Sequence, residues 1–157
     1  MIPSTRPVQD SDLPQLAEMI ASLATFHDDL PGVAPRQLAR DVLGPCPWFT
    51  VILAEGARGM LQGYAALMSV GQLQFGARAL DMHHLFVVPK ARGTGVGTRL
   101  VDAAIACARN KRCAYVSVGT HPDNRAAGVF YESRGFNRRD GFGHRFSMTL
   151  TSSQPPT

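Results

Sequence analysis

Hydrophobic residues in the first part of the chain recur at helical spacing. After a short predicted strand at residues 5–8, apolar side chains return every three or four positions, which predicts an amphipathic helix. These side chains are Leu13, Leu16, Ala17, Ile20, Leu23 and Ala24. The helix ends in a polar segment, residues 26–32, which is either a turn or a substrate-facing loop. Pro35 then begins a second short helix to about Leu43, because proline is tolerated in a first turn.

The middle of the chain has strand character. Residues 48–55 and 61–70 are rich in β-branched and aromatic residues on either side of a turn, which predicts a β-hairpin. Residues 79–88 predict a central strand, residues 98–110 a helix, and residues 115–118 a short apolar strand parallel to the central one. A helix at residues 125–133 and final strands at Phe136 and residues 144–150 complete a mixed α/β fold.

A basic, glycine-rich loop follows the central strand. Gly93, Gly95 and Gly97 lack a Cβ, so backbone N–H groups can approach a ligand closely, and the first turn of the next helix adds unpaired donors. Positive charge comes from Lys90, Arg92 and Arg99. The spacing matches neither a P-loop nor a G-x-G-x-x-G dinucleotide loop. The loop therefore predicts a binding site for a phosphate or pyrophosphate group that is of neither of these two types. The alternative is a turn that only joins the strand to the helix.

Composition indicates a globular protein of one domain. The chain has 157 residues, a net charge of +4 and 45% hydrophobic residues, enough to bury a sizeable core. Three cysteines without metal-like pairing, no signal-peptide pattern and no apolar run long enough to span a membrane predict a cytoplasmic protein that holds no metal. The pI near 9.3 suits any polyanion, but the basic residues are scattered, and we expect neither a nucleic acid nor a membrane as partner.

Two motifs resemble the GNAT superfamily of N-acetyltransferases. The first is Arg92-x-x-Gly95-x-Gly97 straight after a strand, and the second is the segment from Asn124 through Tyr131 to Gly135-Phe136. The resemblance implies a mixed, mostly antiparallel sheet of about seven strands with about four helices, and a parallel central strand pair splayed around acetyl-CoA. It also implies a single domain over residues 1–150 before a polar tail at residues 151–157, and a homodimer.

Within the superfamily, the chain looks most like the spermidine/spermine and thialysine N-acetyltransferase branch. That branch has an acidic pair in the central strand, where this chain has His83 and His84. Without both carboxylates, a polyamine acceptor would lose two attractive charges. The acids that remain to compensate are Asp28, Asp29, Asp41, Glu55 and Asp81.

The resemblance implies transfer of acetyl from acetyl-CoA to the primary amine of a small molecule, by direct attack in a ternary complex. Backbone groups of Leu85, Phe86 and Val87 would pair with the pantetheine arm. The pyrophosphate would be held by Arg92, Gly93, Thr94, Gly95, Val96, Gly97 and Thr98. Asn124 would cap its helix and bond the pantetheine amides, and Tyr131 would protonate the leaving thiolate.

His83 takes the place of the family's glutamate and is the candidate general base, since imidazole is a competent base at neutral pH. Strand alternation predicts that His84 points to the opposite face unless a bulge intervenes. Cys107 and Cys113 have no base nearby in sequence, which argues against a covalent acetyl-cysteine route. The alternatives are packing roles for His83 and Tyr131, a non-catalytic CoA-binding regulatory module, and a protein or peptide N-acetyltransferase.

Overall fold

The computed structural model describes residues 3–29, 32–140 and 146–150. The chain divides into two compact units, Met1–Gly119 and Thr120–Thr157, and each is described by itself. None of the described helices is long and apolar enough to cross a bilayer.

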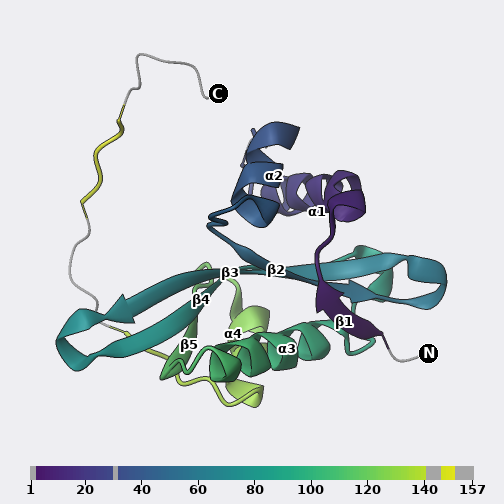
Figure 1. Cartoon of the computed structure of the whole chain (residues 1–157). Coiled ribbons are helices and arrows are strands. Elements are labelled where there is room, and N and C mark those ends of the chain that lie inside the picture. The colour runs from purple at the N-terminus through teal and green to yellow at the C-terminus, as the bar shows by residue number, and fades with distance from the viewer. Residues whose placement is uncertain (1–2, 30–31, 141–145, 151–157) are drawn as a thin grey trace. The chain divides into compact units, whose positions relative to one another are not determined.

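A mixed sheet of five strands forms the centre of the first unit (Figure 1). The strands are β1 (Ser4–Pro7), β2 (Thr50–Glu55), β3 (Leu61–Gln72), β4 (Ala77–Val87) and β5 (Tyr115–Val118), and they lie side by side in chain order. Neighbours pair antiparallel except β4 and β5, which are parallel. The predicted mixed, mostly antiparallel sheet is confirmed, with five strands in the described residues instead of about seven. Phe136 and residues 146–150 lie outside regular structure, and residues 144–145 lie outside the described residues.

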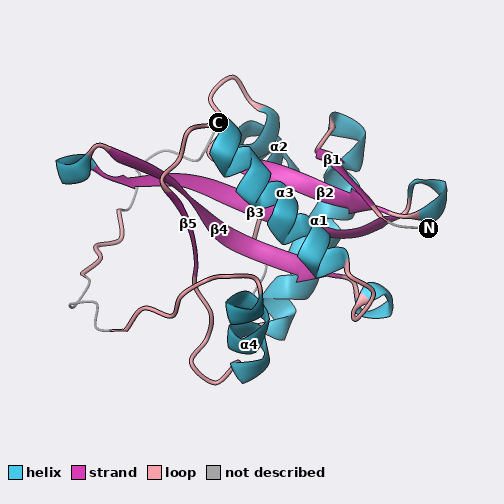
Figure 2. Cartoon of the chain, turned by 90° about the horizontal axis from the view of Figure 1, so that it is seen from below, coloured by secondary structure: helices cyan, strands magenta, loops and turns pink. Residues whose placement is uncertain are grey.

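Helices cover both faces of this sheet. On one face lie α1 (Leu13–Phe26) and α2 (Pro35–Leu43), and on the other lies α3 (Val96–Asn110) (Figures 1 and 2). The apolar stripe of α1 is Leu16, Met19 and Leu23, which are all buried because their spacing places them on one side of the helix. They pack with Tyr64, Phe86 and other residues of the sheet in one cluster. That core holds the two strands on which the candidate site is built.

An ion-pair network fixes the start of the chain to the sheet edge. The guanidinium of Arg6 contacts both carboxylate oxygens of Asp12, at 2.7 and 2.9 Å, and also pairs with Glu55 on β2. Asp12 is buried, and the hydrogen bond from Arg6 lowers its carboxyl pKa. Because breaking a buried pair leaves an uncompensated charge, the pair ties β1 to the segment that leads into α1.

Gly63 allows β3 and β4 to approach closely. A Cβ at this position would lie 2.4 Å from the carbonyl oxygen of Phe86, a separation that atoms essentially never show. Gly63 pairs with Val87 in the antiparallel ladder. The absence of a side chain at Gly63 therefore sets the position of the β4 segment that leads into the glycine loop.

Candidate active site

A β-bulge in β4 brings His83 and His84 to the same side of the sheet. Ala66 of β3 pairs with His84, but the next residue, Leu67, pairs with Met82, so His83 is the extra residue. Such an insertion breaks the alternation of side chains along a strand. The two imidazole rings stack with centroids 4.3 Å apart and planes 15° apart. The opposite-face orientation of His84 is predicted only for a strand without a bulge, and the bulge places His84 on the same side as His83.

The two histidines belong to a row of rings that crosses three strands. Phe49, just before β2, stacks on His83 with ring centroids 5.5 Å apart. On the other side, Tyr64 meets His84 edge-on at 6.0 Å and lies 6.0 Å from Phe86. Tyr64 and Phe86 are buried, His84 is half-buried and His83 is exposed. The row, Phe49–His83–His84–Tyr64–Phe86, thus leads from the core to the surface.

His84 is a neutral hydrogen-bonding residue. Its Nδ1 lies 3.0 Å from the hydroxyl of the fully buried Tyr64. Burial first, then the neighbouring His83 and His27, lower the pKa of His84 from 6.5 to about 4. Burial also raises the pKa of Tyr64, so its hydroxyl stays protonated. A buried donor without an acceptor costs about 1–3 kcal/mol. We infer that Tyr64 donates to Nδ1 and that His84 carries its own proton on Nε2.

Beyond the bulge, one edge of β4 is open within the described sheet. The pairing of β4 with β5 covers residues 79–82 and ends at Met82 and Val118. Residues 84–87 still pair with β3 on their other side, and Phe86 is buried whereas Leu85 and Val87 are half-buried. The strand therefore presents unused backbone groups where a ligand can pair as an added strand does. One carbonyl, that of Val87, accepts a 3.1 Å hydrogen bond from Nε of Arg92.

The glycine loop leads from this edge into α3. Gly93 and Gly95 have φ angles of 73° and 89°, in the left-handed region where a Cβ is strained, and nothing lies within 4 Å of a Cβ built there. Gly95 caps α3 without a side-chain hydrogen bond, and the first intrahelical bond runs from Arg99 N–H to the carbonyl of Gly95.

The first-turn N–H groups of α3, at Val96, Gly97 and Thr98, are consequently free of intrahelical partners. Arg92, Gly93, Thr94 and Gly95 are exposed, Gly97 and Thr98 are half-buried, and the side chain of Val96 is buried. Exposed first-turn N–H groups and the helix dipole together form an anion-binding site. The predicted pyrophosphate residues thus lie together at the N-terminus of a 15-residue helix.

In the second unit, Asn124 is the N-cap of α4 (Arg125–Ser133), and Tyr131 lies on that helix. Oδ1 of Asn124 accepts a 3.1 Å hydrogen bond from the N–H of Ala127, which confirms the expected cap. Tyr131 packs edge-on against Phe130 and Phe136, with centroids 5.2 and 5.6 Å away. Burial raises the pKa of the Tyr131 phenol to about 12, so the group carries its proton at neutral pH, as an acid must. The roles of both residues in catalysis stay predictions.

Three of the five acids that are candidates for attracting a polycation have other partners. Asp41 receives two hydrogen bonds from Arg40, at 2.7 and 2.9 Å, and Glu55 pairs with Arg6. Asp81 accepts a 2.7 Å hydrogen bond from Ser117 on β5. Asp28 and Asp29 are exposed in the turn after α1.

Sequence reasoning misses Phe49, Tyr64 and His27 as neighbours of the histidine pair. In the sequence, nothing distinguishes Tyr64 from the other hydrophobic residues of its predicted strand. Its contact with His84 depends on the register of β3 against β4. In the sequence, Phe49 belongs only to the predicted hairpin, and His27 only to the turn after the first helix. The nearest signal is the concentration of aromatic residues at the start of the predicted hairpin.

Comparison with known proteins identifies the family. The sequence profile of the Acetyltransferase (GNAT) domain matches residues 47–138, which include β2–β5, α3 and α4. The chain is 33% identical over 95 residues to the uncharacterized N-acetyltransferase YhfO of Bacillus subtilis (strain 168), covering 60% of this chain and 64% of that relative. The chain therefore spans less than two thirds of YhfO.

Thialysine N-epsilon-acetyltransferase of Mus musculus is 27% identical over 139 residues, covering 83% of this chain and 81% of that protein. The crystal structure of a probable acetyltransferase superposes with a TM-score of 0.76 at 21% identity, over 96% of this chain and 99% of that one. This similarity confirms the fold. The protein belongs to the GNAT acetyltransferase family.

Proposed function

We propose that this protein transfers an acetyl group from acetyl-CoA to the primary amine of a small molecule, by direct attack in a ternary complex. Membership of the family implies acetyl-CoA as the donor. The observation that carries the proposal is the continuous path from the open edge of β4, at Leu85, Phe86 and Val87, into the free N–H groups at the start of α3. An extended amide-bearing arm suits the first part, and a pyrophosphate suits the second.

The donor would be held by backbone groups and a few charges. N–H groups of residues 93–98 would bind the pyrophosphate, with Arg92 adding a full positive charge beside them. Asn124 would bond the amides of the pantetheine arm. Backbone N–H groups of β4 would hydrogen-bond the thioester oxygen, on which negative charge develops during attack.

The amine must lose a proton before it attacks, because an alkylammonium has a pKa of about 10.4. His83 is the proposed base: its ring is exposed and, in the described part of the chain, makes stacking contacts but no hydrogen bond. His84 is less suited, since its lowered pKa of about 4 makes it a weak base and Tyr64 occupies its Nδ1. His84 would instead donate a hydrogen bond from Nε2.

The leaving sulfur needs a proton when the carbon–sulfur bond breaks. Tyr131 is the proposed acid, since its phenol keeps its proton at neutral pH and can give that proton to the sulfur as negative charge develops there. The amine nitrogen forms the new bond to the carbonyl carbon and releases its extra proton to solvent. The carbon–sulfur bond breaks, and the sulfur leaves with the bonding electrons and takes the phenolic proton of Tyr131. Solvent then restores the proton on Tyr131.

A charge change at Thr98 tests the donor site. Thr98 is the third residue of α3, where an aspartate stabilises a helix through the dipole, so Thr98→Asp is expected to fold. The added carboxylate repels pyrophosphate, and we expect CoA affinity measured by calorimetry to fall by about tenfold or more, which is about 1.4 kcal/mol. Thr98→Asn has nearly the same shape without the charge and is the matched control.

Two outcomes would change the proposal. Equal CoA affinity in Thr98→Asp and Thr98→Asn would remove the start of α3 from the donor site. Tight CoA binding without thiol release for any amine would favour the non-catalytic CoA-binding module, and release with peptides alone would favour a protein or peptide N-acetyltransferase. The homodimer and the cytoplasmic location stay predictions, and sedimentation velocity tests the first of them.

A further inference from the structure

We propose that the acceptor of this enzyme is an amine carried on an aromatic ring, which stacks on a platform formed by Trp48, Phe49 and His83. The inference rests on the proposed acetyl transfer and names the substrate class of the same site. The proposed acceptor differs from the extended polycations that the acidic pair of the spermidine/spermine and thialysine branch would attract.

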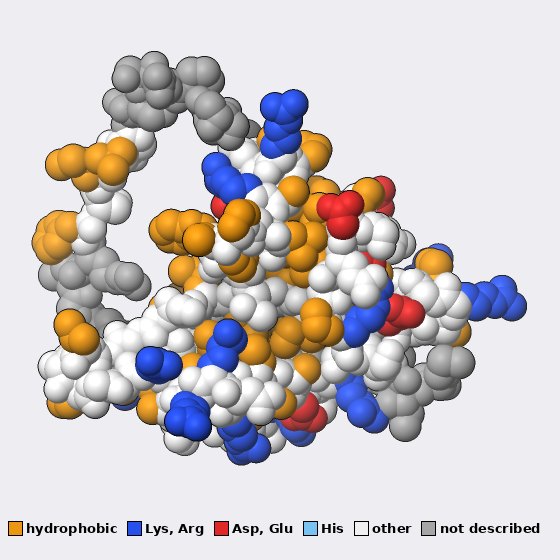
Figure 3. Space-filling model, in the orientation of Figure 1, with side chains coloured by type: hydrophobic (Ala, Val, Ile, Leu, Met, Phe, Trp, Pro, Cys, Tyr) orange, Lys and Arg blue, Asp and Glu red, His pale blue; other side chains and the backbone are white. Residues whose placement is uncertain are grey.

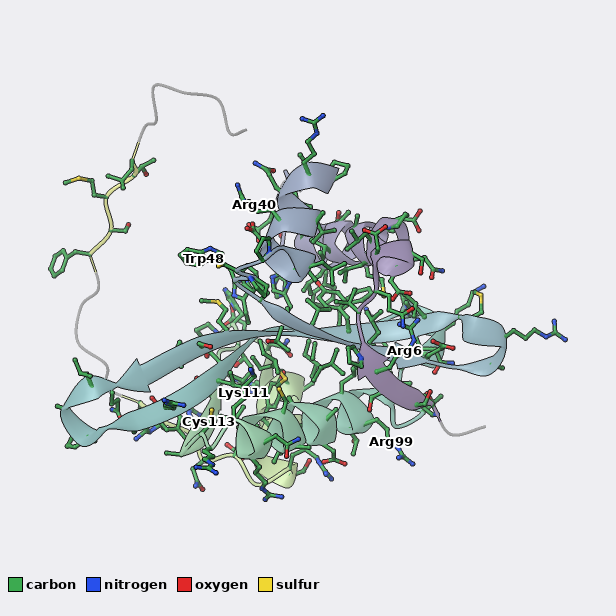
Figure 4. The ribbon with its side chains drawn as sticks, viewed as in Figure 1. Arg6, Arg40, Trp48, Arg99, Lys111 and Cys113 are labelled. Carbon is green, nitrogen blue, oxygen red and sulfur yellow. The ribbon has the colours of Figure 1, made fainter. Side chains whose placement is uncertain are left out.

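The platform begins in a cavity next to the candidate base. Arg40, Asp41, Trp48 and Phe49 line this cavity, which has a volume of about 520 Å³ and is open to solvent. Trp48 is 76% exposed, and it projects outward beside Arg40 of α2 (Figure 4). Exposed hydrophobic side chains continue over the surface around α1 and α2 (Figure 3). A large aromatic side chain with this much exposure next to a cavity offers a stacking surface for a ligand.

Phe49 connects the cavity to His83, the candidate base. It lines the cavity and also stacks on His83, with ring centroids 5.5 Å apart and planes 29° apart. His83 in turn stacks on His84. A flat ring seated on Trp48 and Phe49 would continue this row, and a short alkyl arm would bring its amine to the ring of His83. The geometry thus favours an aromatic body with a short arm over a long flexible chain.

Charge around the row opposes a polycation. Asp41, on the cavity wall, is neutralised by Arg40, and Glu55 and Asp81 have partners of their own. The row itself contributes two imidazole rings and no carboxylate that could attract a second ammonium group. Arg92 adds a further cation over the ring of Phe26, 5.9 Å from its centroid. An acceptor with one amine on an uncharged ring meets less repulsion here than spermidine does.

Steady-state kinetics with acetyl-CoA tests the inference. We expect kcat/KM to be at least about tenfold higher for 2-phenylethylamine or tryptamine than for butylamine and spermidine, because burying one stacked ring contributes about 1.4 kcal/mol or more. Trp48→Ala should raise the KM for 2-phenylethylamine several-fold and reduce its advantage over butylamine, with kcat changing less. Trp48 is exposed, so its loss should not unfold the protein. Leu73→Ala, which removes a side chain 96% exposed in the β3–β4 hairpin, is the matched control and should keep the wild-type selectivity.

The outcomes separate this inference from the proposed function. Acetylation of spermidine in preference to the aryl amines, with a KM raised by Asp29→Asn, would overturn the aromatic acceptor and leave acetyl transfer intact. Preference for aryl amines that Trp48→Ala does not change would overturn the platform. Failure of every amine to accelerate thiol release, in a protein that still binds CoA, would contradict the proposed function and this inference with it.

Discussion

Acidification below pH 6.5 is expected to destabilise the protein through His84. The folded protein holds the pKa of this imidazole at about 4, whereas the unfolded chain has the ordinary value of 6.5. The unfolded state therefore binds a proton at a higher pH than the folded state does. The contribution of neutral His84 to stability is fully present above pH 6.5 and is lost as the pH falls from 6.5 toward 4.

The magnitude follows from the two pKa values and the exposure of the ring. Each tenfold difference in proton affinity is worth about 1.36 kcal/mol, so a fully buried group would cost roughly 2–3 kcal/mol on going from pH 7.5 to 4.5. His84 is only half-buried, and solvent screening reduces that figure. We expect about 1 kcal/mol.

Urea unfolding of the wild type and of His84→Asn, followed by circular dichroism, measures this effect. The asparagine oxygen can still accept from the Tyr64 hydroxyl but does not titrate in this range. Between pH 7.5 and 4.5 the wild type should lose about 1 kcal/mol more of its free energy of unfolding than the variant loses. Between pH 7.5 and 8.5 the two curves should run parallel, which is the internal control. Equal losses on acidification would refute the lowered pKa of His84, and with it the neutral hydrogen-bonding role.

Three further changes probe the site and its support. Tyr131→Phe should lower kcat about 100-fold or more without weakening acetyl-CoA binding, because the hydroxyl acts only as the thiolate forms; equal turnover would remove Tyr131 from the acid role. His83→Ala should shift or abolish the acidic limb of the pH–rate profile, and an unchanged limb would make His83 structural. Gly63→Ala should cost about 1–3 kcal/mol in urea unfolding by forcing β4 away from β3. Its control, Gly128→Ala, meets nothing within 4 Å and should stabilise α4; a harmless Gly63→Ala would contradict the close approach.

Local pattern predicts the elements whose ends are marked by their own residues. The helix at 35–43 begins at Pro35, the helix at 125–133 follows the Asn124 cap, and the strand at 115–118 is a short apolar run; all three have the predicted bounds. The hairpin strands β3 and β4 extend further than predicted, to Gln72 and from Ala77. Their outer ends, Gly71-Gln72 and Ala77-Arg78, carry no large apolar side chain and are held by backbone pairing, which leaves little trace in the pattern of apolar residues.

The part of the candidate site that is formed by the backbone of the glycine loop can be predicted from the sequence. The part that depends on the register of β3 against β4 cannot. Glycine spacing and the helix that follows are enough to indicate the anion site around Gly95 from the sequence alone. The stacking of His83 on His84 is not predictable, because an extra residue in β4 is defined only by what β3 presents opposite it. The same is true of the Tyr64 hydrogen bond. Side-chain contacts across strands depend on the register of the two strands, and the sequence of one strand does not specify that register.

The most direct test of the account is acetyl-CoA-dependent release of CoA thiol by the purified protein in the presence of small primary amines, with the acetylated product identified by mass spectrometry. We expect thiol release that requires both acetyl-CoA and an amine, with one N-acetylated product for each thiol released. Thiol release that does not depend on the amine, or none at all in a protein that binds CoA, would contradict it.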